Sequence, residues 1–324
     1  MTTTDAAIRL QIVIEQFKTA ESKIFLQLVD LLERNVESFL RQADFSQMSF
    51  YEVDKALSIQ NENVQNVGEQ VLARYYEDLK NFIAELRIYE LRLSQGTDHG
   101  FSLVDTFQIP IGVDGTEKGK NVLAVIHSWW SNLRSQVFGY VRRSNFEKKT
   151  NLQILADLKG QRALRFKDGI FYSLRRFALS MNGALIQHLS TMTRESALIH
   201  SKAKGIMWNA MLERSVCSRC RGLDLVPFSI RRGPRSPLHY GCRCFSIPIL
   251  SDTVIERRSY YSWLETQPRD FIESVLGKKR SALFLKGGLS AKRFAELQLD
   301  KKFEPLTLEE IKKTVPEAFT RAGL

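Results

Sequence analysis

Cysteine, glycine and proline are scarce in this sequence, and their distribution limits what the chain can be. The 324 residues include 4 Cys, 18 Gly and 8 Pro, and turn-forming residues are sparse before about residue 205. This pattern indicates long helices and excludes a turn-rich β-sandwich. The sequence also lacks a run of about 18 apolar residues and an N-terminal basic segment followed by an apolar one. We therefore expect a soluble, non-secreted protein.

Charge is divided unevenly along the chain, whose length and 44% hydrophobic content indicate about two domains with real cores. Residues 1–100 carry 10 Lys and Arg against 16 Asp and Glu, a net charge of −6. The remaining residues carry 37 against 20, a net charge of +17. Such an excess is expected of a protein that meets phosphate-bearing partners, although a generic basic surface is the alternative.

Two long stretches of the N-terminal third have helical periodicity. Apolar residues recur at spacings of three and four over residues 5–42 and again over residues 64–93. We predict that residues 1–100 form an acidic antiparallel helical hairpin, whose remaining apolar face packs on another subunit for docking or assembly. Residues 101–120 read as a loop-rich linker that includes a short edge strand, and residues 121–324 as a basic domain.

Further helices are expected after residue 121. Trp129 and Trp130 occur at helical spacing, which favours core packing over stacking on bases. Segments 152–158 and 171–192 are predicted helices, and segment 247–250 a short strand. A further helix is expected from Pro268 to about Lys279, and another after Ser290. Thr307 and Glu310 have capping-box spacing, which predicts one terminal helix over residues 308–319. The histidines outside the cysteine window, His99, His188 and His200, read as loop, surface or packing residues.

All four cysteines fall in one window, together with one histidine. Cys217 and Cys220 form a Cys-x2-Cys pair, and His239, Cys242 and Cys244 follow a loop as His-x2-Cys-x-Cys. A Cys-x2-Cys turn lets two thiolates face one ion at about 2.3 Å, and a second pair from a later turn completes a tetrahedron. The spacing predicts a zinc site within a subdomain at about residues 205–250.

Five candidate ligands are available for four places. Cys217, Cys220 and Cys244 are the expected ligands, with either His239 or Cys242 as the fourth. The alternative is that the cysteines stay as reduced thiols or form two disulfides that hold the loop. We expect a structural metal rather than a catalytic one, because soft ligands suffice to close the coordination sphere.

Additional residues accompany the five candidate ligands. Near them lie Trp208, Arg214, Gly222, Asp224, Pro237, Arg243 and Pro248; upstream lie Thr193, Arg194 and Glu195; downstream lie Trp263, Gln267, Leu276, Gly277, Arg280, Phe284, Gly287, Leu289 and Ser290. This pattern, over about residues 152–308, resembles the signature of the phage head morphogenesis family, the MuF-like minor head proteins. The chain departs from it at Tyr240, where the family has proline after histidine, and in its long basic loop after Cys220.

The resemblance implies a mainly α fold, in which the N-terminal hairpin joins a MuF-like α+β domain with a zinc-clamped Cys/His loop and a few short strands. It implies a non-enzymatic minor head protein of a tailed bacteriophage, present in the host cytoplasm during assembly and inside the capsid of the virion at the portal vertex. The implied partners are the portal protein, the major capsid or scaffold protein and non-specifically bound double-stranded DNA, and no membrane.

Four arginines in and beside the cysteine window are the expected contacts with DNA: Arg231, Arg232, Arg235 and Arg243. Two other functions are compatible with a zinc-bearing basic protein. A zinc-dependent nucleic-acid enzyme or effector packaged with the genome would need a cluster of carboxylates or an activated histidine, and the sequence offers none. A cytosolic zinc-stabilised DNA-binding protein would have no role in the virion.

Overall fold

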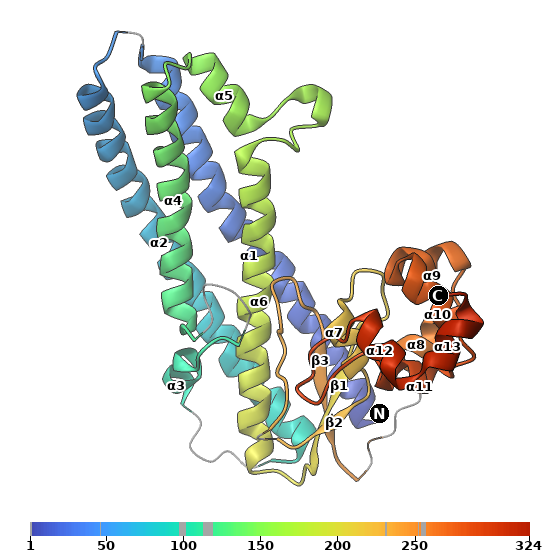
Figure 1. Cartoon of the computed structure of the whole chain (residues 1–324). Helices are drawn as coiled ribbons and strands as arrows, with labels where there is room; N and C mark the ends of the chain where they lie inside the picture. The colour runs from blue at the N-terminus through green and yellow to red at the C-terminus, as the bar shows by residue number, and fades with distance from the viewer. Residues whose placement is uncertain are drawn as a thin grey trace.

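The computed structural model describes residues 2–45, 47–96, 102–112, 119–230, 232–251, 253 and 257–324. It is mainly helical, with one small sheet. Four long helices form an elongated bundle, and the sheet and short C-terminal helices form a lobe against one end of it (Figure 1). The long helices are α1 (Thr3–Gln42), α2 (Phe50–Ser94), α4 (Val122–Phe146) and α6 (Ile170–Ile199). The predicted mainly α fold with a few short strands is confirmed.

Local sequence explains why the long helices begin where they do. Thr2 caps α1 and Ser49 caps α2, each in a capping box with the acidic residue three positions later, Asp5 or Glu52. Such boxes satisfy backbone N–H groups that have no partner in the first turn. The helix expected over residues 5–42 is confirmed, and the second helix begins well before the predicted stripe at residue 64.

One hydrophobic core runs through all four long helices. It contains residues from Leu10 to Leu189, including the buried Trp129 and Trp130, whose predicted packing role is confirmed. Gly68 lets α2 approach α4 closely, since a Cβ at that position would lie 2.2 Å from the Trp130 ring. The boundary expected at residues 101–120 therefore does not separate two cores, and α4 and α6 of the same chain pack on the N-terminal hairpin.

Three shorter segments connect the long helices: α3 (Leu103–Gln108), α5 (Asn151–Lys159) and the 3-10 turn η1 (Arg162–Leu164). In the segment where a short edge strand was expected, residues 103–108 form the helix α3, and beyond it the Ile111 N–H donates to the Lys120 carbonyl at 2.9 Å. Ser102 explains the helix, because its side chain caps it by accepting from the Asp105 N–H. His188 of α6 is buried and its Nε2 lies 3.1 Å from the Ile109 carbonyl, and burial lowers its pKa to about 4. His99 lies outside the described residues.

The lobe contains a three-stranded antiparallel sheet of order β2-β1-β3, with β1 at Gly205–Asn209, β2 at Pro227–Phe228 and β3 at Phe245–Ile249. In register, Met207 of β1 pairs with Pro227 and with Ile247. The helices of the lobe are α7 (Ser218–Leu223), α8 (Tyr260–Leu264), α9 (Arg269–Leu276), α10 (Lys278–Lys286), α11 (Ala291–Glu296), α12 (Leu308–Thr314) and α13 (Pro316–Ala322). They share a second hydrophobic core with the sheet.

The single terminal helix predicted over residues 308–319 is wrong. The Thr307–Glu310 capping box starts α12 as expected, but the helix ends at Thr314 and α13 begins at Pro316. Proline has no N–H to donate and disfavours helical geometry in the residue before it, which explains the break at Val315. Among the described residues no helix is long and apolar enough to cross a membrane.

Candidate metal centre

The first two candidate ligands lie on and beside α7. Cys217 is the N-cap of this helix, and its Sγ accepts from the Cys220 N–H at 3.4 Å. Cys220 follows after nearly one helical turn and is fully buried. The cap and the turn together direct both sulfur atoms to the same side, as the Cys-x2-Cys spacing predicted.

The other three candidates come from the segment that leads into β3. His239 and Cys242 lie in a tight turn, in which the Cys242 N–H donates to the His239 carbonyl at 3.1 Å. Gly241 adopts a left-handed φ of 77°, which an L side chain tolerates poorly, so glycine suits this turn. Cys244 directly precedes β3, and both Cys242 and Cys244 are buried. The pairing of β3 in the sheet therefore positions residues 239–244 beside α7.

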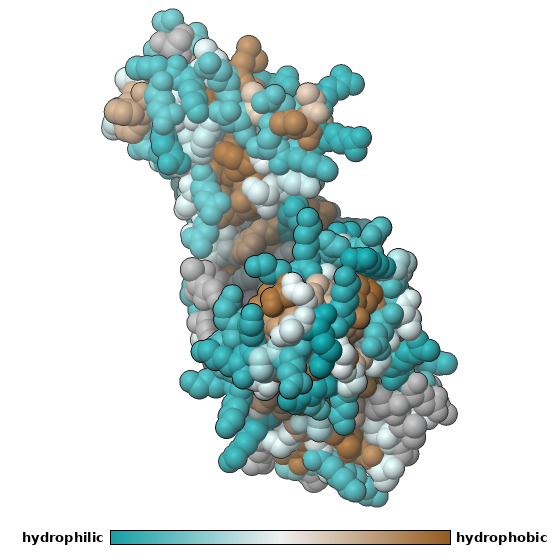
Figure 2. All heavy atoms as spheres, turned by 45° about the vertical axis from the view of Figure 1, so that its right-hand side comes forward, coloured by the Kyte–Doolittle hydropathy of each residue, from teal (hydrophilic) through white to brown (hydrophobic). Residues whose placement is uncertain are grey.

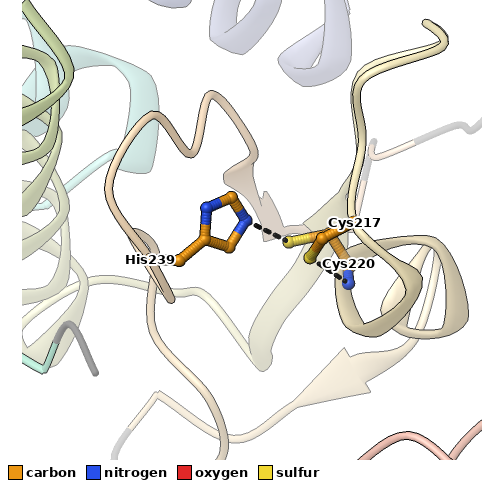
Figure 3. Close-up of side chains that lie close together, drawn as sticks. All are labelled: Cys217, Cys220 and His239. Atoms are coloured by element: carbon orange, nitrogen blue, oxygen red, sulfur yellow. Dashed lines mark hydrogen bonds between the residues drawn. The ribbon is translucent and has the colours of Figure 1, made fainter. Parts of the chain in front are cut away.

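The five side chains meet in one cluster. Cys220 is central, because its Sγ lies 3.8 Å from Cys242 Sγ and 3.9 Å from His239 Nε2. Cys217, Cys220 and His239 form one group that could hold a metal ion, and Cys220, Cys242 and Cys244 form another. Figure 3 shows the His239 ring pointing at the sulfur atoms on α7. All five predicted ligands therefore belong to one possible metal-binding group.

The cysteines are free thiols and are not paired in disulfides. A disulfide bond requires a sulfur–sulfur distance of about 2.05 Å, far shorter than the spacing at Cys220 and Cys242. The structure therefore does not follow the alternative of two disulfides that hold the loop.

A backbone carbonyl orients the histidine for metal binding. His239 Nδ1 lies 2.9 Å from the carbonyl oxygen of Tyr240, so Nδ1–H donates to it and Nε2 is left as the atom that faces the sulfurs. Metal-binding histidines usually have such a partner on the second ring nitrogen, which fixes the tautomer. Tyr240, which provides this carbonyl, is also the position at which the chain departs from the phage head morphogenesis pattern, which has proline there.

Close contact between these groups shifts their pKa values strongly. Contact with Cys220 lowers the pKa of Cys217 to about 4, and contact with Cys220 also lowers the pKa of Cys242. Contact with Cys217 raises the pKa of Cys220 and raises that of His239 to about 11. The opposite shifts of neighbouring cysteines reflect their close packing around Cys220. A bound metal ion would favour the thiolate form of each sulfur ligand, because the thiolate is the form that binds metal.

The nearest acidic residue in the sequence has a structural role. Asp224 accepts from the backbone N–H groups of Ala210 and Tyr260 at 2.8 and 2.7 Å, and it also pairs with Arg257. It therefore joins the segment after β1 to the start of α8. The sequence pattern includes Asp224 but gives no signal for these distant partners.

Two residues of the predicted upstream motif join α6 to the lobe. Arg194 and Glu90 form a buried ion pair at 2.7 Å, and Arg194 Nη1 donates to the Ser246 carbonyl of β3 at 2.5 Å. Glu195 pairs with Arg235, and burial raises the pKa of Glu195 to about 7. The bundle is thus linked to residues 217–244, which hold the five candidate ligands and are called the metal-binding segment below, and to β3, which follows them.

The predicted DNA-contacting arginines are placed differently from one another. Arg235 is largely occupied by Glu195 and by the Ile230 carbonyl, and Arg243 pairs with Glu213. Arg232 is exposed and has no side-chain partner within the described parts of the chain. Arg231 lies outside the described residues. A common phosphate-facing surface for the set is thus not evident.

Comparisons with protein-family models, with curated proteins and with solved structures found no match for this chain. The resemblance to the phage head morphogenesis family therefore depends on the residue pattern itself.

Proposed function

We propose that the Cys/His cluster is a structural zinc centre. Zinc bound tetrahedrally by thiolates at about 2.3 Å holds its sulfur ligands about 3.8 Å apart. The Cys220–Cys242 sulfur spacing of 3.8 Å agrees with this value. Soft sulfur donors beside one imidazole are the ligands that zinc prefers in structural sites.

The contacts favour one set of four ligands: Cys217, Cys220, His239 and Cys242. His239 Nε2 lies 3.9 Å from Cys220 Sγ, and Cys217 and Cys242 have the largest influence on its pKa, so we take these four side chains as the ligand set. Cys244 instead approaches the cluster through Cys220 and Cys242. Cys242→Ser should then weaken zinc affinity far more than Cys244→Ser in a competition titration with a chelator of known affinity.

The surroundings of the cluster support a non-enzymatic role. A catalytic zinc keeps a position open for water beside a general base. Here Cys220 and Cys242 are buried, and the carboxylate of Asp224 is occupied by its own partners. Such a centre supplies folding free energy to the lobe rather than chemistry.

The chain as a whole is proposed to be a structural minor head protein of a tailed bacteriophage, inside the capsid at the portal vertex. The observation that carries this proposal is the Cys/His signature with its flanking motifs over residues 152–308, now with its ligands gathered in one cluster. The long bundle, joined to the lobe through Arg194 and Glu195, provides an extended surface for the portal and capsid proteins. The net charge of +11 supports contact with packaged DNA.

Two experiments test this proposal. Mass spectrometry of purified particles of the encoding phage should find the chain at low copy, and a reconstruction of the portal vertex without imposed symmetry should place it inside the head. Absence from particles would contradict the virion role. Zinc-dependent cleavage of DNA by the purified protein, lost in Cys220→Ser, would favour the packaged enzyme instead.

A further inference from the structure

The largest local excess of positive charge lies at the end of the bundle remote from the metal centre. Residues 142–176 contain ten Lys and Arg against three Asp and Glu, a net charge of +7 in a chain whose total is +11. This segment comprises the end of α4, all of α5, a loop and the start of α6. Four of these cations, Arg142, Lys149, Lys159 and Arg175, pair with carboxylates. Arg162, Arg165 and Lys167 of the loop have no carboxylate partner among the described residues, so the loop holds unpaired positive charge.

The loop between α5 and α6 projects from the side of the bundle (Figure 1). Residues 161–168 are all exposed. The two ends touch at Gly160 and Gly169: a Cβ on Gly169 would lie 2.3 Å from the Lys159 backbone, and one on Gly160 would lie 2.6 Å from the Gly169 nitrogen. The loop is thus a closed Ω-type loop whose neck requires two glycines.

Internal hydrogen bonds hold this loop in one shape. The Phe166 N–H donates to the Gln161 carbonyl at 2.9 Å, and the Gln161 N–H donates to Asp168 Oδ1 at 2.9 Å. Arg165 and Phe166 both adopt left-handed φ values, 53° and 61°. Non-glycine residues are uncommon in this region, and consecutive examples persist where the surrounding structure imposes them, often at functional positions.

The cations of this loop are available, whereas most of those near the metal centre are not. Arg162, Arg165 and Lys167 make no side-chain hydrogen bond or ion pair with any described residue. Arg235 and Arg243, by contrast, pair with carboxylates of their own chain. Pairing neutralises the field that a phosphate would feel, so the loop presents the stronger anion-binding surface.

Two apolar side chains project among these cations. Leu164 is 54% exposed and Phe166 is 50% exposed, so both side chains are accessible to a bound partner. The aromatic face of Phe166 is a platform on which an unpaired base can stack, and base stacking needs no sequence preference. In Figure 2 the bundle end of the molecule is mostly hydrophilic, with separate hydrophobic side chains on it.

We infer that residues 160–169 form a nucleic-acid contact, in which Arg162, Arg165 and Lys167 bind the phosphodiester backbone and Phe166 stacks on exposed bases. The contact is sequence-independent, because phosphates carry no base information and stacking accepts every base. This inference rests on the DNA contact in the proposed function and requires neither the metal nor the virion role. It moves that contact from the metal-binding segment to the side of the bundle.

The test compares a triple variant, Arg162→Gln with Arg165→Gln and Lys167→Gln, with the parent chain. Affinity for a 30-nucleotide duplex of mixed sequence and for a single strand of equal length is measured by fluorescence anisotropy at several salt concentrations. We expect at least about a tenfold loss of affinity at low salt, and a salt dependence flatter by about one unit per removed phosphate contact. Phe166→Ala should weaken binding of the single strand more than that of the duplex.

A matched control removes the same charge elsewhere. Lys278→Gln with Lys279→Gln and Lys301→Gln replaces three exposed lysines of the C-terminal lobe, and it should bind DNA nearly as the parent does. Because Arg162, Arg165 and Lys167 are exposed and make no side-chain hydrogen bond or ion pair with any described residue, the loop variant should retain the parent's circular dichroism spectrum and melting temperature.

The outcomes separate the possible explanations. Equal losses in the loop variant and the control would overturn the loop assignment, since net charge alone would explain binding. Unchanged DNA affinity in the loop variant would also overturn it, and reduced sedimentation of that variant with phosphatidylglycerol vesicles would then identify a membrane surface instead. If the parent itself binds neither DNA form at low salt, the DNA contact in the proposed function fails together with this inference.

Discussion

The bundle and the C-terminal lobe each have a hydrophobic core, but they differ in how much regular structure surrounds it. In the bundle, four helices of 25 to 45 residues bury apolar side chains along their whole length. In the lobe, the segment between Cys220 and β3 contains a two-residue strand and little other regular structure. The Cys/His cluster lies where this segment has few backbone hydrogen bonds of its own. Apolar burial therefore stabilises both parts, and the proposed zinc site would add most to the lobe around residues 205–250, where regular structure is sparse.

The largest expected effect is the loss of the lobe without loss of the bundle. Cys220→Ser removes the central donor of the cluster. Apparent binding energies of structural zinc are about 10–16 kcal/mol, and this binding energy is folding energy. Hydrogen exchange should become fast over residues 210–245 and stay slow in α1, α2, α4 and α6. Equal loss of protection in the bundle and lobe would show that the two parts fold as one unit.

The next effect concerns the buried link between bundle and lobe. Arg194→Met leaves Glu90 buried without its partner, which should lower the free energy of unfolding by about 3–5 kcal/mol. The double variant Glu90→Met with Arg194→Met removes both charges and should recover much of this loss. Urea denaturation of the parent, the single and the double variant measures it. A double variant no more stable than Arg194→Met would mean that the ion pair is not the source of the effect.

A smaller effect tests packing within the bundle. Gly68→Ala places a methyl group against the buried Trp130 ring, so it should lower the free energy of unfolding by about 1–3 kcal/mol. Gly183→Ala in α6 is the matched control, because a Cβ there meets no atom within 4 Å. The control should be neutral or stabilise the helix by up to about 1 kcal/mol. Equal results for the two would contradict the close approach of α2 and α4.

The smallest effect is a pH dependence that belongs to the bundle. Burial, assisted by Asp78, raises the pKa of Glu21 from 4.5 to about 7. The folded state therefore binds more protons than the unfolded state between these values, so Glu21 makes stability fall as pH rises from about 4.5 to 7. Glu21→Gln should remove this slope and raise stability at pH 8 by about 1–2 kcal/mol. Glu62→Gln on the exposed face of α2 is the control, and an unchanged slope in Glu21→Gln would refute the assignment.

Sequence predicted the parts of this structure that depend on local spacing. Apolar residues three and four apart were sufficient for α1 and α6, and the Cys-x2-Cys and His-x2-Cys-x-Cys spacings were sufficient for the five candidate ligands. The packing of the helices and the partners of the charged side chains depend instead on contacts between residues that are far apart in the sequence. Tyr75 of α2 donates to Asn182 of α6 at 2.7 Å, and no local pattern shows that α6 covers this face of the hairpin. Likewise, Arg235 read as a free cation because its partner Glu195 lies forty residues upstream.

The sequence contained local signals against two of the predictions, the single terminal helix over residues 308–319 and the short edge strand within residues 101–120. Pro316 is the local signal that divides the terminal helix, whereas the capping box at Thr307 and Glu310 specifies only where the first helix begins. The β-branched and proline residues that follow α3 favour a strand, whereas Ser102 has the spacing of an N-cap to Asp105, which indicates a helix.

The metal content of the purified chain tests the central claim most directly. Protein prepared under reducing conditions should contain one zinc ion per chain by elemental analysis. Its thiols should become reactive toward a thiol reagent when a strong chelator removes the metal. Protein with no bound metal, and with bonds between its cysteines, would contradict the account of the lobe.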